Sequence, residues 1–479
     1  MEDETLRLQF GTAATTIGTH WLAIQESNKD FKKPYVLAFE AKGRVNFATE
    51  RCCLPRYLPE FEFLCRTRDG HVQVYDQSAV AERGADDGLW SWGRLGEQNL
   101  VEVEEFRAHM SLHNFYEGCS VVNGGNVGNA TLEQVEDRVR TVLETCDQLR
   151  VVQSLVDMDS SWGGLAHEVM TYIAEECPGA VTVMVGNDWS YPMVTANDDA
   201  LFRTAPEAQD RVKIEARKRV NLASSMALLS DVSHLVVPVA MSSTSLADSA
   251  FPQLSFDRSS CADVSSVVAT ALELSMSAHR GRPVHEIMEG FQSSMKVAGI
   301  SASFPYTSDP VPLLRSICDS VTNEVGRNSS MEDDPFRSCS LLPVIQQSSS
   351  ARRLNTDHTK KKYYRRFYFR GAFAGYPSLR SAIDTCPISA RKVALHWSDA
   401  VPLTLLAPLC PQTLQTSSGD AISKLELSSR TGVYLRTLAQ LAARGDKRTL
   451  HEFTRAGMSP DAFEELGATL LGMSDAYFT

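Results

Sequence analysis

The chain has 479 residues, enough to bury a large core and to form two or three domains. A net charge of -12 argues against broad nucleic-acid binding, which needs a basic surface, and no apolar run approaches the roughly 20 residues of a membrane span. The acidic start MEDETLRLQF lacks both an apolar signal core and the arginine-rich character of a transit peptide, so we expect neither.

The cysteines favour reduced thiols over a metal centre. Eleven cysteines include no CxxC pair, and the histidines are scattered along the chain. Because structural zinc sites usually show close ligand spacing, the sequence predicts no metal ligands and indicates a reducing, cytosolic environment.

Strand and helix patterns alternate through the first half of the chain. Thr5–Phe10 has the two-residue period of a strand, Gly11 ends it, and a helix follows with Ile17, Trp21 and Ile24 on one face. Later pairs are a helix at 131–150 before a strand at 151–156, a helix after 164 before a strand at 181–185, and a helix at about 212–229 before a strand at 235–240. This alternation predicts an α/β fold with a doubly wound, mainly parallel sheet.

The turn after the strand at 151–156 is the most distinctive motif. It contains Gly163 and Gly164 and leads at once into a helix, which is how nucleotide-binding proteins aim backbone N–H groups at a phosphate. Asp157, Asp159 and Trp162 lie in the same turn. Two carboxylates would repel a phosphate, so the architecture predicts a nucleotide fold while the chemistry of the turn argues against the phosphate.

Two interpretations of the acidic turn stay open. Asp157 and Asp159 could offer two carboxylates to a cation, or the Asp and Ser side chains could satisfy the backbone and cap the helix after Gly164. His167 and Glu168 follow closely and are interpreted as helix surface.

The second half of the chain begins less regularly. Residues 326–362 are polar and Ser-rich without a period, which predicts a long flexible insertion. Helical patterns then mark the end of the chain, at Val433–Ala443, Lys447–Ala456 and Pro460–Met473.

A stretch at 360–373, KKKYYRRFYFRGAF, interleaves basic and aromatic residues. It could contact anionic lipid or an acidic protein tail, stack single-stranded nucleic acid, or form an aromatic strand with arginines on its outer face. The first and third interpretations are compatible. The candidate surface-contact residues are Lys360, Lys361, Lys362, Arg365, Arg366 and Arg370.

Three segments resemble tubulin. The opening LRLQFGTAATTIGTHW is similar to the tubulin start, where a strand ends in a glycine-containing loop that contacts the nucleotide. The tract DRVRTVLETCDQLRVVQSLVDMDSSWGGLA aligns without gaps with the segment that leads into the tubulin phosphate loop. VNLASSMALL is similar to the helix whose asparagine reaches the guanine base, which implies that role for Asn221.

The chain as a whole resembles the Misato family of tubulin-related proteins more closely still. The matching pieces are LQFG and GTHW within residues 8–21, ETCDQL and DMDSSWGGLA within 144–166, and the ending GMSPDAFEELGATLLGMSDAY. The resemblance covers the chain from end to end except for about 320–360. It implies a tubulin-like fold with a second α+β domain and C-terminal helices.

The resemblance also implies a degenerate nucleotide site. The tubulin motif GGGTGSG falls on residues 159–165, where Asp-Ser-Ser replaces three glycines and Trp162 replaces a small hydroxyl residue. The residues of this vestigial site are Gly11, Thr12, Asp159, Ser160, Ser161, Gly163, Gly164 and Asn221. We expect no cofactor, although a Mg²⁺ ion that bridged Asp159 to phosphate would allow GTP to bind.

The tubulin catalytic signature G-x-x-N-x-D is missing from the corresponding segment, ALELSMSAHRGRPVHEIMEGF. Glu273, His285 and Glu286 are the local candidates for acid/base chemistry, and ordinary helix-surface charges are the simpler interpretation. We therefore predict no catalytic residues and no active GTPase.

The patterns and the resemblance together predict four parts. These are a tubulin-like nucleotide-binding-type domain at 1–245, a second α+β domain at 246–325 and 363–425, the flexible insertion at 326–362, and a C-terminal helical region at 426–479.

The function that the resemblance implies is non-catalytic. Misato-family proteins take part in mitochondrial distribution, morphology and inheritance, in the cytoplasm and peripherally at the mitochondrial outer surface. The implied partners are proteins, such as tubulin or mitochondrial outer-surface components, and a membrane surface, but not nucleic acid. A GTP-binding tubulin-like switch or assembly factor, and a factor in tubulin biogenesis, stay open as alternatives.

Overall fold

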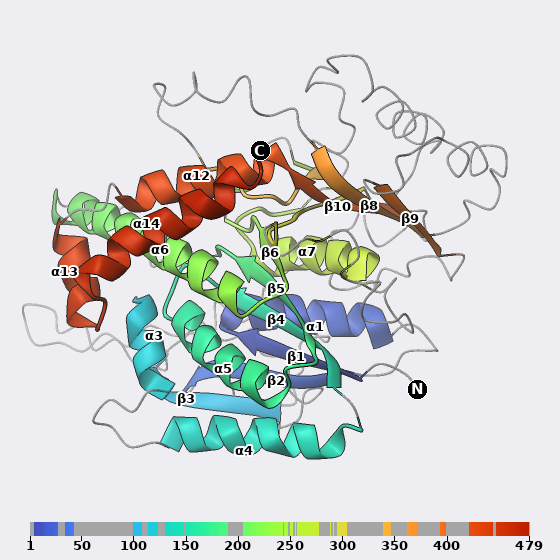
Figure 1. Cartoon of the computed structure of the whole chain (residues 1–479), viewed down its shortest axis with the longest axis horizontal. Helices are drawn as coiled ribbons and strands as arrows, with labels where there is room; N and C mark the ends of the chain where they lie inside the picture. Colours follow the sequence, from blue (N-terminus) through green and yellow to red (C-terminus); the bar gives the residue numbers. More distant parts are fainter. Residues whose placement is uncertain are drawn as a thin grey trace, which may run out of the picture.

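A computed structural model of the chain (Figure 1) describes a set of residues with gaps between them. The described residues are 4–26, 34–42, 99–107, 114–122, 130–147, 149–189, 205–242, 244–247, 250–251, 254, 256–276, 288, 291, 295–303, 339–345, 362–370, 393–398, 421–443 and 447–478.

A sheet of six parallel strands lies at the centre of the first half, in the order β3-β2-β1-β4-β5-β6. The strands are β1 (Glu4–Phe10), β2 (Tyr35–Lys42), β3 (Leu100–Arg107), β4 (Leu149–Asp157), β5 (Val181–Asn187) and β6 (Leu235–Val239). Every residue of β5 and β6 is buried, as is typical of parallel strands with both faces covered. The predicted α/β class with a parallel sheet is confirmed.

Helices cover both faces of this sheet (Figure 1). They are α1 (Thr12–Glu26), α3 (Phe115–Val122), α4 (Ala130–Thr145), α5 (Trp162–Glu176), α6 (Ala205–Asp231) and α7 (Cys261–Met276). The chain leaves β1 toward β2 and leaves β4 in the opposite direction toward β5. Right-handed crossovers therefore put α1 and α5 on opposite faces, where α1 packs with α7 and α5 packs with α3 and α6.

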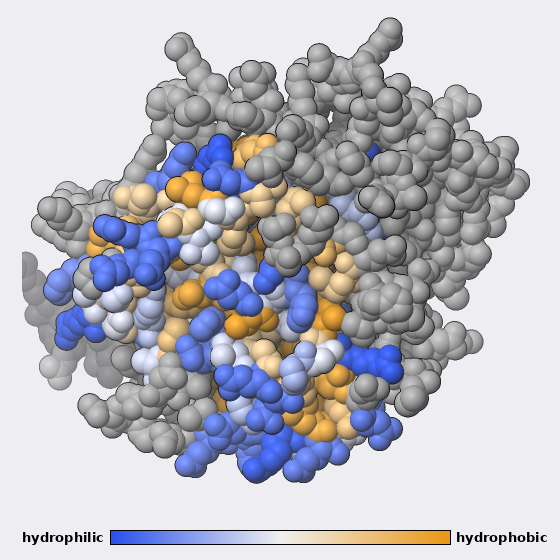
Figure 2. Space-filling model, in the orientation of Figure 1, coloured by the Kyte–Doolittle hydropathy of each residue, from blue (hydrophilic) through white to orange (hydrophobic). Residues whose placement is uncertain are grey.

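Helix α4 is amphipathic, with one buried apolar face and one exposed polar face. Val135, Val139 and Val142 are buried at helical spacing, whereas most of the charged residues between them are exposed. This exposed face forms the hydrophilic band at the lower edge of the molecule in Figure 2.

The second half of the chain contributes a four-stranded sheet in the order β7-β10-β8-β9. Its strands are β7 (Gly299–Ser303), β8 (Lys362–Arg370), β9 (Val393–Ser398) and β10 (Ala421–Ser428). β10 is antiparallel to β7 and β8, and β9 is parallel to β8. Helix α7 packs against α1 and also contacts β7, β8 and β10, so one apolar core extends from the first sheet to the second.

Residues 339–345 correct the prediction of a flexible insertion over 326–362. Leu341 is buried, its N–H donates to the carbonyl of Ile300 at 2.9 Å, and its carbonyl accepts from the N–H of Ala240 at 2.7 Å. The N–H of Val344 donates to Ser245 at 2.9 Å. The leucines Leu341 and Leu342 explain the difference, because burying them ties the segment between the end of β6 and β7. Apart from Lys362, the rest of the predicted insertion lies outside the described residues.

The three predicted C-terminal helices are confirmed as α12 (Ser429–Ala443), α13 (Lys447–Arg455) and α14 (Pro460–Asp475). Ser459 caps α14, accepting from the N–H of Ala462 at 3.0 Å. Beyond α14, the hydroxyl of Tyr477 donates to the Val297 carbonyl at 2.6 Å and accepts from the Val297 N–H at 3.0 Å. Each helix in the described ranges is too short or too polar to cross a bilayer.

Candidate functional site

The carboxyl ends of β1 and β4 meet at the centre of the first sheet, where the strand order reverses. Open α/β sheets bind their ligands at this point, because the two loops that follow such strands diverge and leave a crevice. The turn after β1 begins at Gly11, and the turn after β4 runs from Asp157 to Ser161. This is the place where the sequence predicts a degenerate nucleotide site.

The side chain of Asp157 occupies the beginning of helix α1. Its two carboxyl oxygens accept hydrogen bonds from the N–H groups of Ala13 at 3.1 Å and Ala14 at 2.8 Å, and one of them also accepts from Asn187 Nδ2 at 2.7 Å. These N–H groups are the ones that a helix start offers to an anion. An internal carboxyl group therefore takes the position that a phosphate would need at α1.

Gly11 makes this close approach possible. Its φ is +95°, a conformation that favours glycine, and a Cβ there would lie 2.5 Å from Asp157 Oδ2 and 2.7 Å from the indole ring of Trp162. The Trp162 ring in turn packs edge-on against Phe106, with 4.5 Å between ring centroids. The turn after β1 is thus enclosed by a carboxyl group and an aromatic ring.

Burial dominates the electrostatics of the two acidic residues. It raises the pKa of Asp157 to about 8, although the hydrogen bond from Asn187 opposes the shift. Burial also raises the pKa of Asp159 to about 7, against the attraction of Lys218. Because the partners of Asp157 are N–H donors, the contacts favour the capping interpretation over the cation interpretation. The helix that Asp157 caps is α1, not the helix after Gly164 as expected.

Three backbone N–H groups at the start of α5 donate hydrogen bonds within the chain. Gly163 donates to the Ser160 carbonyl at 3.3 Å, and Gly164 donates to the Ser161 carbonyl at 3.0 Å. The Ser160 hydroxyl accepts from the Trp162 N–H at 3.4 Å and donates to the Asp157 carbonyl at 3.1 Å. Helix α5 therefore begins at Trp162, and both glycines lie in its first turn instead of in a tight turn before it.

These glycines serve helix packing. A Cβ at Gly164 would overlap the carbonyl oxygen of Phe115 in α3, and one at Gly163 would overlap the hydroxyl of Ser225 in α6. From the other side, a Cβ at Gly118 in α3 would overlap the carbonyl oxygen of Ser161. The absence of side chains at these positions lets the backbones of α3 and α5 come into contact.

Asn221 joins the same elements from α6. The side chain is 1% exposed, its Nδ2 donates to the Asp159 carbonyl at 3.0 Å, and its Oδ1 accepts from the Phe115 N–H at 2.8 Å. Thr12 is also buried, and its hydroxyl donates to Glu40 on β2 at 3.2 Å. The structure thus brings the predicted site residues together, with side chains that bind neighbouring parts of the chain.

The side chain of the candidate acid Glu273 is also buried and also binds a neighbouring helix. It is buried in α7 and accepts from Trp21 Nε1 and Gln25 Nε2, both at 2.9 Å, so it ties α7 to α1. The other two acid/base candidates, His285 and Glu286, lie outside the described residues.

The predicted basic contact surface at 360–370 needs a correction. The aromatic strand is confirmed as β8, but Arg365 is 2% exposed and Arg366 is fully buried. The guanidinium of Arg366 donates to the Tyr364 hydroxyl at 3.1 and 3.2 Å and lies 5.2 Å from the ring of Phe291. A guanidinium group can stack on aromatic rings, so an arginine beside aromatic residues can be buried in this strand instead of facing solvent. These two residues are therefore no surface contact.

The other members of that set are less fully described. Lys362 and Arg370 are the end residues of β8. Lys360 and Lys361 lie outside the described residues.

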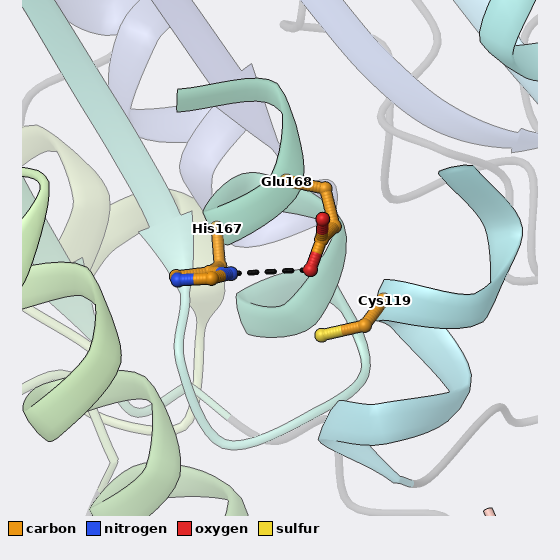
Figure 3. Close-up of side chains that lie close together, drawn as sticks. All are labelled: Cys119, His167 and Glu168. Atoms are coloured by element: carbon orange, nitrogen blue, oxygen red, sulfur yellow. Dashed lines mark hydrogen bonds and ion pairs between the residues drawn. The ribbon is translucent and has the colours of Figure 1, made fainter. Parts of the chain in front are cut away.

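A further cluster, which the sequence did not predict, lies between α3 and α5 (Figure 3). Cys119 projects from α3 toward His167 and Glu168 on α5, and one potential ligand atom from each residue lies within 4.8 Å of the other two. His167 and Glu168 were interpreted as helix surface, but their side chains are only 23% and 18% exposed. No local spacing connects Cys119 to the other two residues, so only the packing of the helices reveals the cluster.

No model of a known protein family matches the chain, and no curated protein is significantly similar to it.

Proposed function

We propose that this chain is a non-catalytic protein with a tubulin-like fold that acts through its surfaces in mitochondrial distribution, morphology and inheritance. The residues that resemble the Misato family support the cellular role. The doubly wound strand order and a second, smaller sheet after it support the tubulin-like assignment. The proposal includes a location in the cytoplasm and, peripherally, at the mitochondrial outer surface.

The proposal that the protein is non-catalytic rests on the contact of Asp157 with the start of α1. The turn at the centre of the sheet is where an open α/β fold would bind a phosphate. Here the N–H groups of Ala13 and Ala14 already bind the Asp157 carboxyl group, and Trp162 lies against Gly11. A nucleotide would have to displace both side chains and uncap α1, which argues for a protein that works without one.

Nucleotide content tests this proposal directly. The full chain is purified gently and denatured, and the supernatant is analysed by ion-exchange chromatography. We expect no stoichiometric nucleotide and no binding of added GTP with Mg²⁺. Stoichiometric GTP or GDP would contradict the proposal.

A GTP-binding switch is the second candidate, because Gly11 and Ser160 follow neighbouring strands at the reversal point of the sheet. The substitution Ser160→Asp separates the two candidates in cells. Ser160 is half-buried, and an aspartate can also accept from the Trp162 N–H, so the variant should fold. An added carboxylate should abolish a phosphate-dependent function and leave a scaffold function intact.

The cellular role is tested by depleting the protein and scoring the mitochondrial network. We expect a collapsed or fragmented network that both the wild type and Ser160→Asp restore. A normal network after depletion would contradict the mitochondrial role. Reduced amounts of folded tubulin, with mitochondria affected only afterwards, would favour a role in tubulin biogenesis.

A further inference from the structure

We propose that Cys119, His167 and Glu168 form a zinc-binding site between α3 and α5 (Figure 3). The three side chains supply a sulfur, an imidazole nitrogen and a carboxylate oxygen, which are the three ligand types that zinc accepts in proteins. The site goes beyond the proposed function, which requires no metal.

The distances are close to those of a tetrahedral zinc site. His167 Nδ1 lies 3.2 Å from Glu168 Oε1. Two ligands at zinc–nitrogen and zinc–oxygen distances of about 2.1 Å are separated by about 3.4 Å when the geometry is tetrahedral. The Cys119 sulfur lies within 4.8 Å of both. A sulfur ligand would need about 3.6 Å, so the thiol has to approach by no more than about 1.2 Å. This movement would replace its present contact with the Gly164 carbonyl at 3.7 Å.

The charges also suit a divalent cation. A thiolate and a carboxylate carry two negative charges and the imidazole is neutral when it binds a metal, so the zinc site as a whole would be neutral. A neutral group costs little to keep in a partly buried position. A cysteine binds a metal as the thiolate, so zinc binding would release the proton of the Cys119 thiol to the solvent.

The packing of the helices holds the ligands in place. Gly118, next to Cys119, lies against the Ser161 carbonyl, and Gly164 lies against Phe115, so α3 and α5 touch along the turn that carries the cysteine. The ligand side chains are part-buried rather than sealed, so solvent reaches them, and a water molecule would be the fourth ligand of the ion. Three protein ligands with one water is the arrangement of an open zinc site.

Cobalt titration of the full chain tests the proposal, because Co²⁺ takes the place of zinc and reports its ligands by absorption. The protein is stripped with a chelator, kept reduced and titrated with Co²⁺ and then with Zn²⁺. We expect one equivalent of Co²⁺ to bind with a thiolate-to-cobalt charge-transfer band and intense tetrahedral ligand-field bands. Zinc should displace the cobalt and abolish both sets of bands.

Variants identify the ligands. Cys119→Ser should abolish the charge-transfer band, and Glu168→Gln should weaken Co²⁺ binding at least about tenfold. The matched control for Cys119→Ser is Cys177→Ser, a half-buried thiol at the other end of α5, and His451→Ala, an exposed histidine on α13, tests a histidine outside the cluster. Both controls should bind as the wild type does, and circular dichroism confirms that each variant is folded.

Two results would overturn the proposal. One is a wild-type protein that binds less than one equivalent of Co²⁺ or Zn²⁺ at micromolar concentrations. The other is a charge-transfer band that survives in Cys119→Ser and disappears in Cys177→Ser. A melting temperature that rises with Zn²⁺ in the wild type but not in Cys119→Ser would support the proposal independently of absorption.

Discussion

Asp157 links the protonation of a buried carboxyl group to the beginning of α1. Its pKa is raised from 3.8 to about 8 by burial, so the folded protein retains a proton that the unfolded chain releases near pH 4. Between these two values the folded state binds more protons than the unfolded state. The stability that this group contributes is therefore full below about pH 4 and is lost as the pH rises toward 8.

We expect the free energy of unfolding to fall with rising pH in this window, by up to about 1.4 kcal/mol per pH unit for this group. Urea denaturation at several pH values measures the slope. Asp157→Asn should flatten the slope without abolishing it, because Asp159 and Asp188 are buried carboxyl groups with raised pKa values as well. Equal slopes in the wild type and Asp157→Asn would refute this account.

At the scale of elements, the contact between α3 and α5 depends on glycine. Gly164→Ala would drive a methyl group into the Phe115 carbonyl, so we expect a loss of about 1–3 kcal/mol in the free energy of unfolding. Gly467→Ala on α14 is the matched control, because nothing lies within 4 Å of its Cβ position. That change should be neutral or should stabilise the protein by up to about 1 kcal/mol. Urea denaturation of both variants measures the difference, and equal midpoints would contradict the packing role.

Elements with a strong period were predictable from the sequence. β1 alternates apolar and polar residues, and β5 and β6 are short apolar runs that are buried throughout, so each shows a pattern typical of a strand. β3 was not predicted. Its sequence, LVEVEEFR, alternates valine with glutamate as a strand does, but it lies at the edge of the sheet and pairs with β2 alone among the described strands. Helix α6 begins at Ala205, before the predicted start near 212, because its first turns are polar and show no period.

The candidate site was predictable in location but not in contacts. The glycine turn and the strand before it indicate a ligand-binding position in any α/β sheet, and the structure puts Gly11, Asp159 and Asn221 around it. That Asp157 caps a helix 144 residues away, or that Arg366 stacks on Phe291, depends on tertiary packing. A local pattern contains no information about such partners, which is also why the cluster at Cys119 was missed.

At the scale of the whole molecule, helix α7 and Tyr477, which follows α14, join the two sheets. One apolar core runs from β1 through α7 to β10, and Tyr477 hydrogen-bonds with Val297 between β6 and β7. We therefore expect one cooperative unfolding transition, with coincident midpoints by tryptophan fluorescence and far-ultraviolet circular dichroism.

Tyr477→Phe should move both midpoints together and cost about 1–3 kcal/mol, because it leaves the buried Val297 groups without their partner. Tyr172→Phe, whose ring is half-buried on α5, should have little effect. Two separate transitions would instead support independent folding on either side of the predicted boundary at 245, and only one of them would respond to Tyr477→Phe.

The contacts of the turn after β4 also affect how a phosphate site could arise there through successive substitutions. Removing the Asp157 carboxyl group takes away the hydrogen-bond acceptor at the start of α1. A smaller side chain in place of Trp162 leaves a gap beside Gly11. Replacing Asn221 removes the hydrogen bonds that join the turn to α3. Each substitution alone should lower the stability of the fold. The size of its effect depends on whether the other two have been made, which is epistasis. A designer who wanted a phosphate site here would have to replace the turn as a unit. Selection by single substitutions would have to pass through variants that are less stable than the starting protein.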